Sequence, residues 1–277
     1  MTGWGSCEAF RPGTAIDDAE GHGLIGTVQV VVDGEDGVER GVVAARVAGI
    51  VGAELRAVQE RHPGGGRALS DEGDQLGHRR ITELLQEWCP GDLVRSEEGD
   101  AIAGARALWV VDPLDGSREF GEGRDDWAVH VALAVDGEPV AGAVALPGLG
   151  LVLSTVDPPR LKDLAEPPRM VVSRTRPPAL ASALAARLGA EMIPMGSAGA
   201  KIAAVVRGEA DIYVHAGGQY EWDSAAPVAV ALAAGYHASR IDGSPLRYGQ
   251  QDPWLPDLLV CHPSLAESAL RALVDLV

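Results

Sequence analysis

Cysteines, aromatic residues and long apolar runs are all scarce in this sequence. Its three cysteines, Cys7, Cys89 and Cys261, lie far apart and form no CxxC pair, so the sequence predicts neither a zinc site nor a disulfide framework. Only 4% of the 277 residues are aromatic, so the core must be built mainly from valine, leucine and alanine. No apolar run is long enough to cross a bilayer, and the first residues do not resemble a signal peptide. We therefore expect a cytoplasmic protein that binds no membrane.

Basic residues are scarce as well. The chain has 40 acidic and 23 basic residues, which gives a formal net charge of -17 at pH 7. Such a charge repels nucleic-acid phosphates and anionic lipids at long range, so we expect no nucleic-acid partner. A small phosphorylated substrate can still bind an acidic protein where metal ions reverse the local charge.

The apolar pattern of the first half predicts a layered α+β unit. Helical spacing is followed by a series of strand-like runs, the middle two joined by a hairpin signal at Asp136 and Gly137. The expected helices cover 42–61 and 75–88, and the expected strands cover 107–112, 127–137, 138–147 and 150–156. Another short strand is expected at 93–95.

The second half instead alternates strands with helices, which is typical of an α/β unit. The expected strands are 169–173, 191–196, 210–216 and 257–261, and the expected helices are 178–188, 198–207, 224–235 and one at the end of the chain. A proline-rich stretch, 157–169, is the best candidate for a boundary between the two halves. We therefore expect a metal-binding α+β subdomain over 41–160, a substrate-binding α/β subdomain over 161–277, and an amino-terminal extension over 1–40.

The stretch WVVDPLDGS ends an apolar run in two aspartates around a proline. Pro113 is expected to end the strand at Asp112, because proline cannot donate to the ladder. Asp112 and Asp115 then flank a rigid residue, so both carboxylates can converge on one point with the Leu114 carbonyl between them. Hard oxygen donors grouped in this way suit Mg²⁺.

Gly116 and Ser117 follow this acidic pair directly. If a helix begins there, its free backbone N–H groups form an anion site beside the metal, and the two together describe a phosphate site. The plain alternative is a strand followed by a tight turn with no ligand.

Further acidic residues stand on both sides of this motif. Glu97 and Glu98 lie upstream in RSEEGD, and Asp223 lies downstream in YEWDSAAP. Taken alone, the two glutamates read as a solvated acidic loop, and Asp223 reads as a helix N-cap.

The segments SEE, WVVDPLDGS and EWDSAAP, in this order, resemble the inositol monophosphatase superfamily of metal-dependent, lithium-sensitive phosphatases. The likeness covers residues 42–277. Within the superfamily, GRDDWAVHVAL, GSAGAK and HAGGQYEWDSAAP are similar to the actinobacterial CysQ branch. Members of that branch are 3'(2'),5'-bisphosphate nucleotidases, which remove the 3'-phosphate of adenosine 3',5'-bisphosphate (PAP) formed in sulfur metabolism. The resemblance implies a layered αβαβα sandwich of the sugar-phosphatase type with two subdomains.

The resemblance also implies a role for individual residues. Two or three Mg²⁺ ions would be held by the carboxylates and one carbonyl of Glu97, Asp112, Leu114, Asp115 and Asp223. Asp115, Gly116 and Ser117 match the phosphate-binding turn. Ser117 would hydrogen-bond the attacking water, and Asp74 in DEGDQ would orient that water and help to deprotonate it.

For the rest of the substrate, Lys201 matches a lysine near the phosphate, and Arg174 is a candidate partner for it. The alternative for both is an ordinary surface charge. Tyr220 and Trp222 either line a base or sugar pocket or pack in the core. His130 and His215 lie in apolar strands, where a hydrogen-bonded core histidine is the commoner explanation.

The expected activity is Mg²⁺-dependent hydrolysis of PAP to AMP by metal-activated water, without a covalent intermediate. The same metal centre also suits inositol-1-phosphate or fructose-1,6-bisphosphate, because the choice among these substrates depends only on the pocket around it. A third alternative is a regulatory protein that binds phosphate without catalysing a reaction. The complete set of acidic residues, Glu97, Asp112, Asp115 and Asp223, argues against it. The oligomeric state is left open, with a homodimer as one option.

Overall fold

The computed structural model of the chain describes residues 36–62, 64–99, 105–175 and 177–276. The extension expected over 1–40 lies almost entirely outside these ranges, as does Cys7. Cys89 and Cys261 are buried. Within the described ranges, no helix combines the length and the apolar character that crossing a membrane requires.

The first sheet has five strands in the order β1-β2-β3-β4-β5. These are β1 (Val94–Ser96), β2 (Ala107–Asp115), β3 (Ala128–Val135), β4 (Glu138–Leu146) and β5 (Leu151–Ser154). β1 runs parallel to β2, and the other neighbours are antiparallel. The predicted hairpin joins β3 to β4, with positive φ angles of 50° at Asp136 and 83° at Gly137.

The second sheet also has five strands, in the order β7-β6-β8-β10-β9. They are β6 (Arg169–Ser173), β7 (Glu191–Met195), β8 (Ile212–Tyr220), β9 (His237–Ser239) and β10 (Trp254–Cys261). β6 lies parallel to β7 and β8, whereas β10 is antiparallel to both of its neighbours. The short strand β9 had no counterpart among the predicted strands. Residues 155–168 cross between the sheets without helix or strand, and the predicted boundary at residue 160 stays a prediction.

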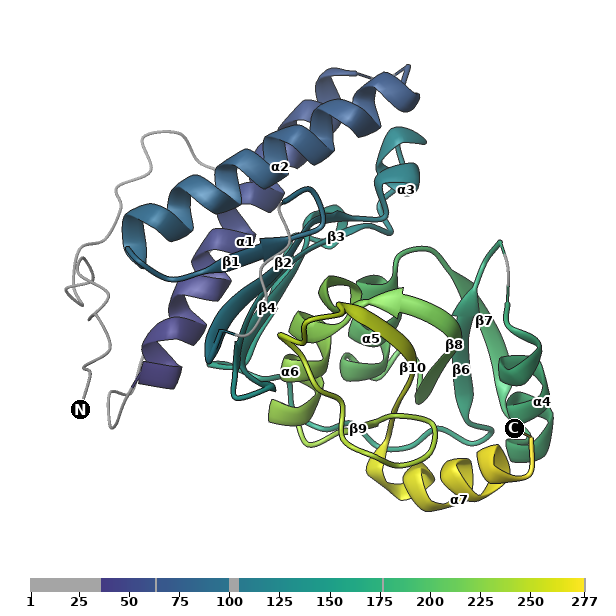
Figure 1. Cartoon of the computed structure of the whole chain (residues 1–277). Coiled ribbons are helices and arrows are strands. Elements are labelled where there is room, and N and C mark those ends of the chain that lie inside the picture. The colour runs from purple at the N-terminus through teal and green to yellow at the C-terminus, as the bar shows by residue number, and fades with distance from the viewer. Residues whose placement is uncertain (1–35, 63, 100–104, 176, 277) are drawn as a thin grey trace.

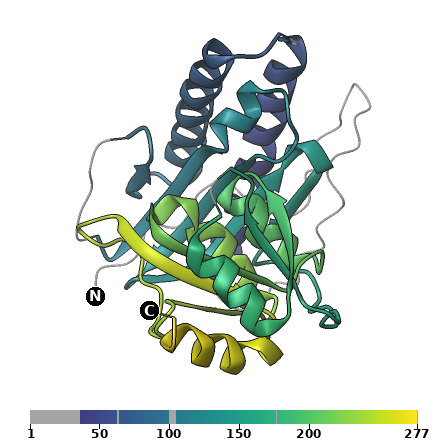
Figure 2. The ribbon, with the colours of Figure 1, turned by 90° about the vertical axis from the view of Figure 1, so that its right-hand side faces the viewer.

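Helices separate and cover the two sheets (Figure 1 and Figure 2). The long helices α1 (Asp36–Arg61) and α2 (Arg67–Trp88) pack on the outer face of the first sheet, and α5 (Ala198–Val206) and α6 (Ala225–Ala233) lie between the sheets. The outer face of the second sheet is covered by α4 (Ala179–Leu188) and α7 (Pro263–Val274). The expected layered αβαβα sandwich is therefore confirmed.

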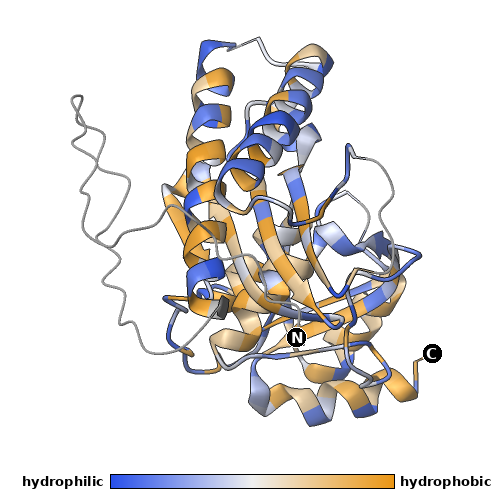
Figure 3. Ribbon diagram, turned by 60° about the vertical axis from the view of Figure 1, so that its left-hand side comes forward, coloured by the Kyte–Doolittle hydropathy of each residue, from blue (hydrophilic) through white to orange (hydrophobic). Residues whose placement is uncertain are grey.

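Each layer boundary buries its own apolar cluster. Along β2, Leu108 and Val110 pack in the cluster between the sheets, whereas Trp109 and Val111 pack against α1 and α2. This is the period-2 alternation of a strand that is covered on both faces. Hydropathy colouring shows the same division on α1 and α2, whose apolar residues face the sheet (Figure 3). α6 is apolar all round because it is buried between two sheets.

Several boundaries differ from the prediction: α1 begins at Asp36 rather than at 42, β8 continues to Tyr220 rather than ending at 216, and β10 begins at Trp254 rather than at 257. Two further differences bear on the site. β2 does not stop at Asp112 but continues through Pro113 to Asp115, because a β-bulge accommodates the proline. Asp112 pairs with His130 and Asp115 pairs with Ala128, so β2 carries one extra residue in this interval. α2 begins at Arg67 rather than at residue 75, since its first two turns are mainly polar and carry little helical periodicity.

Candidate metal and phosphate site

Three aspartates meet where the first sheet faces the second. Asp112 and Asp115 come from the bulged end of β2, and Asp223 ends the short 3₁₀-helix η2 (Glu221–Asp223). One carboxylate oxygen from each lies within 4.8 Å of the others. Asp112 and Asp115 are buried, and Asp223 is half-buried. Grouped carboxylate oxygens of this kind suit a hard divalent cation such as Mg²⁺.

The cluster holds more negative charge than its surroundings can offset. Burial and repulsion from Asp115 and Glu97 raise the pKa of Asp112 well above its ordinary value. Burial and repulsion from Asp115 also raise the pKa of Asp223 to about 7, although the Tyr220 N–H and the Lys201 charge act in the opposite direction. Asp112 and Asp223 therefore carry negative charge less readily than ordinary carboxylates, and a bound cation would favour their charged forms. This property fits a metal centre.

Glu97 stands at the edge of this group. β1 is parallel to β2 with Ser96 opposite Val111, so the chain leaves β1 at Glu97 beside Asp112. The residue as a whole is exposed, but its carboxyl is crowded by protein atoms. This desolvation and repulsion from Asp223 raise its pKa to about 7. Glu97 is not among the three carboxylates whose oxygens converge, so its role as a ligand stays a prediction.

The turn after the second aspartate has the form expected for a helix start. Gly116 has φ 95° and ψ 41° and caps the short helix α3 (Ser117–Gly121). This left-handed conformation favours glycine, and a Cβ there would also lie 3.2 Å from the Cβ of Trp127. The first N–H groups of a helix have no partner within it, which leaves them available for an anion. Just before this turn, in the bulged end of β2, Leu114 donates its N–H to Asp112 Oδ1 at 3.0 Å.

Asp74 and Ser117 are brought together from different layers. The Ser117 hydroxyl lies 2.7 Å from Asp74 Oδ1 and 3.1 Å from the Leu114 carbonyl oxygen, and it can donate to either. Burial and repulsion from Glu98 raise the pKa of Asp74, although the Ser117 hydrogen bond lowers it. Asp74 therefore lies beside the predicted phosphate turn, despite being 43 residues away in sequence.

Glycines on α2 allow this approach. Asp74 stands next to Gly73, and Gly77 lies one turn further along the same helix. A Cβ at Gly77 would lie 3.0 Å from the Pro113 carbonyl oxygen, and one at Gly73 would lie 2.7 Å from a ring carbon of Phe120. The helix backbone can therefore pack directly on the β2 bulge and on α3.

Sequence reasoning missed the partners of Asp115. Its carboxylate accepts hydrogen bonds from the start of α5: Ser197 Oγ and the Gly199 N–H at 2.5 Å each, and the Ala198 N–H at 3.1 Å. These hydrogen bonds connect the start of α5, the helix between the sheets, to the acidic motif at the end of β2. The motif GSAGAK contained the signal, because a serine followed by small residues suits a helix start that receives a carboxylate.

His130 was expected to be a hydrogen-bonded core residue, and it is fully buried with Nδ1 3.0 Å from the Trp222 carbonyl oxygen. Its other ring nitrogen, Nε2, also lies 3.3 Å from Asp115 Oδ2. Gly199 makes room for this ring, since a Cβ at that position would lie 1.8 Å from Nε2. His130 therefore belongs to the surroundings of the site as well as to the core.

Lys201 is not a surface charge. It is 6% exposed, and its Nζ donates to the carbonyl oxygens of Gly196 at 3.0 Å and Ser197 at 2.6 Å. Burial lowers the pKa of its ammonium group, although the charges of Asp115 and Glu119 act in the opposite direction. In this structure Lys201 supports the loop that leads into α5, and its predicted contact with substrate phosphate stays a prediction.

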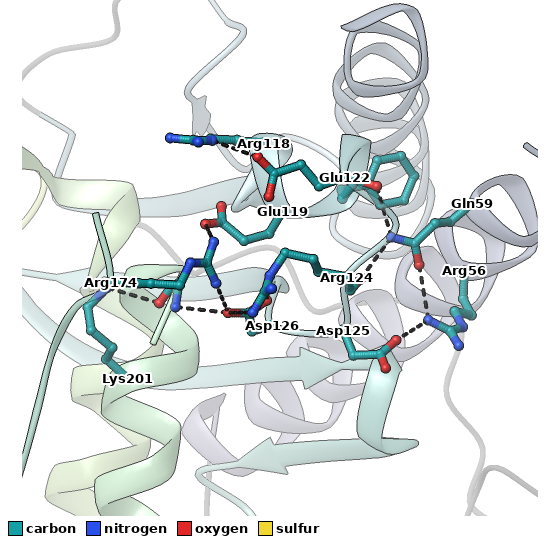
Figure 4. A network of polar contacts seen from close by, with 12 residues as sticks. Arg56, Gln59, Arg118, Glu119, Glu122, Arg124, Asp125, Asp126, Arg174 and Lys201 are labelled. Carbon is teal, nitrogen blue, oxygen red and sulfur yellow. Dashed lines mark hydrogen bonds and ion pairs between the residues drawn. The ribbon is translucent and has the colours of Figure 1, made fainter. Parts of the chain in front are cut away.

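Arg174 belongs to an ion-pair network beside the same loop (Figure 4). Its guanidinium donates to Glu119 at 2.7 Å and to Asp126 at 2.8 Å. Asp126 also accepts the Gly196 N–H at 2.9 Å and pairs with Arg124 at 2.7 Å. The network links α3 to the start of α5, so Arg174 has a structural role here, and its predicted role in substrate binding stays a prediction.

Comparison with known proteins gives one consistent family. Residues 42–276 match the model of the inositol monophosphatase family. The 3'-phosphoadenosine 5'-phosphate phosphatase of Mycobacterium tuberculosis is 48% identical over 222 residues, which cover 75% of this chain and 82% of that protein. The 3'(2'),5'-bisphosphate nucleotidase CysQ of Escherichia coli K12 is 32% identical over 197 residues, covering 66% of this chain and 80% of that protein. The crystal structure of CysQ from Bacteroides thetaiotaomicron matches with a TM-score of 0.71 and 26% identity, covering 81% of this chain and 97% of that one.

Proposed function

The chain belongs to the inositol monophosphatase family, and on this premise we propose that it is a Mg²⁺-dependent phosphomonoesterase that removes the 3'-phosphate of PAP to give AMP. The observation that carries the proposal is the group of three converging aspartates beside the Asp74 and Ser117 pair. The nucleotide substrate is supported by the 48% identity to a phosphatase named for this compound.

The residues that would hold the cation are the carboxylates of Asp112, Asp115 and Asp223, with Glu97 and the Leu114 carbonyl at their edge. A divalent cation bound there supplies positive charge that acidifies water and offsets the charge of the phosphate. The four carboxylates are sufficient for more than one ion, and we propose two or three.

Ser117 and Asp74 would act on the attacking water. When the Ser117 hydroxyl donates to Asp74, its oxygen lone pairs are free to accept a hydrogen bond from a water molecule. Asp74 can then receive a proton from that water, because burial has already raised its pKa. The N–H groups of Gly116 and Ser117 would bind phosphate oxygens as charge develops on them.

Phosphate release measured with the purified full chain tests the proposal. PAP, inositol-1-phosphate and fructose-1,6-bisphosphate are compared with Mg²⁺ and with EDTA, and the Asp112→Asn variant serves as the inactive control. We expect Mg²⁺-dependent turnover with the highest kcat/KM for PAP. A preference for inositol-1-phosphate would overturn the nucleotide assignment, and no turnover of any substrate would favour a silent phosphate-binding protein.

A further inference from the structure

Beyond the metal centre, we propose that Tyr220, Trp222 and Trp254 form the seat of the nucleobase and so select nucleotides over sugar phosphates. This inference rests on the proposed nucleotide reaction and names the part of the chain that recognises the leaving group. The three residues are called the aromatic seat below.

The rings of the aromatic seat are in mutual contact. Tyr220 and Trp222 stack with ring centroids 4.7 Å apart and an interplanar angle of 12°. Trp254 meets Tyr220 edge-on, with centroids 5.4 Å apart and an angle of 81°. Tyr220 ends β8 and Trp254 begins β10, and these two residues are paired in the ladder. The sheet therefore holds the rings in register.

Two of the three rings of the aromatic seat are open to solvent, whereas Trp222 is half-buried and packs against the core between the sheets. Tyr220 is 44% exposed and Trp254 is 47% exposed. The other large rings of the described residues are buried or half-buried, and four are fully enclosed: Trp109, Phe120, Trp127 and Tyr248. Two exposed rings side by side present apolar surface that a ligand can cover.

Two glycines in the backbone next to the aromatic seat leave room for its rings. Gly217 and Gly218 have φ angles of 115° and 89°, which favour glycine. A Cβ at Gly218 would lie only 1.7 Å from Cζ2 of the Trp254 indole. The Gly218 carbonyl is also fixed, since it lies 2.8 Å from His215 Nε2. The indole can therefore occupy this position only because residue 218 has no side chain.

The backbone of the aromatic seat contacts Asp223 and the histidine beside Asp115. The Tyr220 N–H donates to Asp223 Oδ2 at 2.7 Å. The Trp222 carbonyl receives His130 Nδ1 at 3.0 Å, and the same imidazole faces Asp115. Both contacts are made by the backbone of Tyr220 and Trp222, so the aromatic seat adjoins Asp223 along the chain. A substrate whose phosphate lies at the aspartates would, in this proposal, meet the rings on that side.

The chemistry of the aromatic seat fits a nucleobase. A nucleobase has a flat π-face that stacks on aromatic side chains, whatever its hydrogen-bonding pattern. Inositol and fructose rings have no such face and would gain little from stacking. The aromatic seat therefore favours a nucleoside phosphate over the other phosphomonoesters that the metal centre could accept.

The test compares Trp254→Ala and Tyr220→Ala with the conservative variants Trp254→Phe and Tyr220→Phe. We expect kcat/KM for PAP to fall about tenfold in the alanine variants, mainly through KM, with recovery in the phenylalanine variants. The ratio of kcat/KM for PAP to that for inositol-1-phosphate should fall with it. Thermal melting checks that all four variants are folded. An unchanged KM for PAP in folded alanine variants would overturn the proposal.

A binding measurement separates this proposal from the proposed reaction. AMP added to the Mg²⁺-loaded protein should quench tryptophan fluorescence, with less quenching in Trp254→Phe, whereas ribose 5-phosphate should not quench. If wild type does not hydrolyse PAP but this quenching is seen, the reaction is wrong and the aromatic seat stands. If wild type hydrolyses PAP and Trp254→Ala instead only abolishes self-association in light scattering, the aromatic seat is an interface and the proposal fails.

Discussion

Arg95 and Glu221 form a buried ion pair that joins the two halves of the candidate site. Arg95 Nη1 lies 2.7 Å from Glu221 Oε2, and the side chains are 4% and 2% exposed. Arg95 stands two residues before Glu97, and Glu221 stands two residues before Asp223. Separating the partners of a buried pair leaves each charge without compensation, which is costly. The pair therefore fixes the relative position of two segments that carry predicted metal ligands.

Replacing Arg95 should weaken both the fold and the metal site. Arg95→Met leaves the Glu221 carboxylate buried without its cation, so we expect a loss of about 3 kcal/mol in the free energy of unfolding. The Mg²⁺ concentration for half-maximal activity should also rise. Urea unfolding and Mg²⁺ titration measure the two effects. Arg271→Met, which removes an exposed pair with Glu267, is the matched control and should change neither. A destabilised Arg95→Met with unchanged Mg²⁺ dependence would limit the pair to a structural role.

Gly77→Ala should move α2 away from the β2 bulge. The new Cβ would lie 3.0 Å from the Pro113 carbonyl oxygen, so the helix or the bulge must give way by a few tenths of an ångström, and we expect this to draw Asp74 away from Ser117. Since a displacement near 1 Å can lower kcat about a hundredfold, this smaller shift should lower kcat by up to about tenfold. Gly49→Ala on α1 is the control, since its Cβ would meet Val152 at an ordinary 3.5 Å. Steady-state kinetics measure kcat for both variants. A Gly77→Ala variant with the kcat of wild type would contradict the proposed role of this close packing.

The metal-free protein should lose stability as the pH rises. The pKa values of Glu97 and Asp223 are about 7 in the folded chain and roughly 4 when unfolded, so the folded state binds more protons between these values. Their contribution therefore becomes less favourable from about pH 4 to pH 7. Melting in EDTA should show the Asp223→Asn variant gaining on wild type across this window. Mg²⁺ should raise the wild-type melting temperature more at pH 8 than at pH 5. A difference in melting temperature between Asp223→Asn and wild type that does not change with pH would contradict the raised pKa values of these carboxyl groups.

Asp112→Asn should abolish turnover without unfolding the chain. The substitution removes a buried negative charge from a cluster that already raises its own pKa values, so the metal-free variant should melt no lower than wild type above pH 7. Phosphate release and thermal melting in EDTA measure the two effects. A large loss of metal-free stability would show that Asp112 is structural.

Local signals predicted most of the elements, and the site only in part. The helices and strands carry apolar periods, and Asp112, Asp115 and Gly116 are adjacent in sequence, so their joint role could be read from one motif. Asp74 was placed by resemblance alone, because nothing in its own surroundings points to Ser117. The contacts of Asp115 with the start of α5 depend on how the second half packs on the first. No local pattern contains that information, and the burial of Lys201 was missed for the same reason.

The bulge in β2 explains the spacing of the acidic motif. In a regular strand, residues three apart point to opposite faces. Leu108 and Val110 pack between the sheets, but Leu114 packs toward α1 and α2, so the face of the even-numbered residues has switched. The extra residue returns Asp115 to the face of Asp112. On an unbroken strand, two aspartates on the same face would have the sequence Asp-x-Asp. The Asp-x-x-Asp spacing in this chain therefore reflects the extra residue of the β-bulge. The number of residues between the two aspartates reveals this irregularity from the sequence alone.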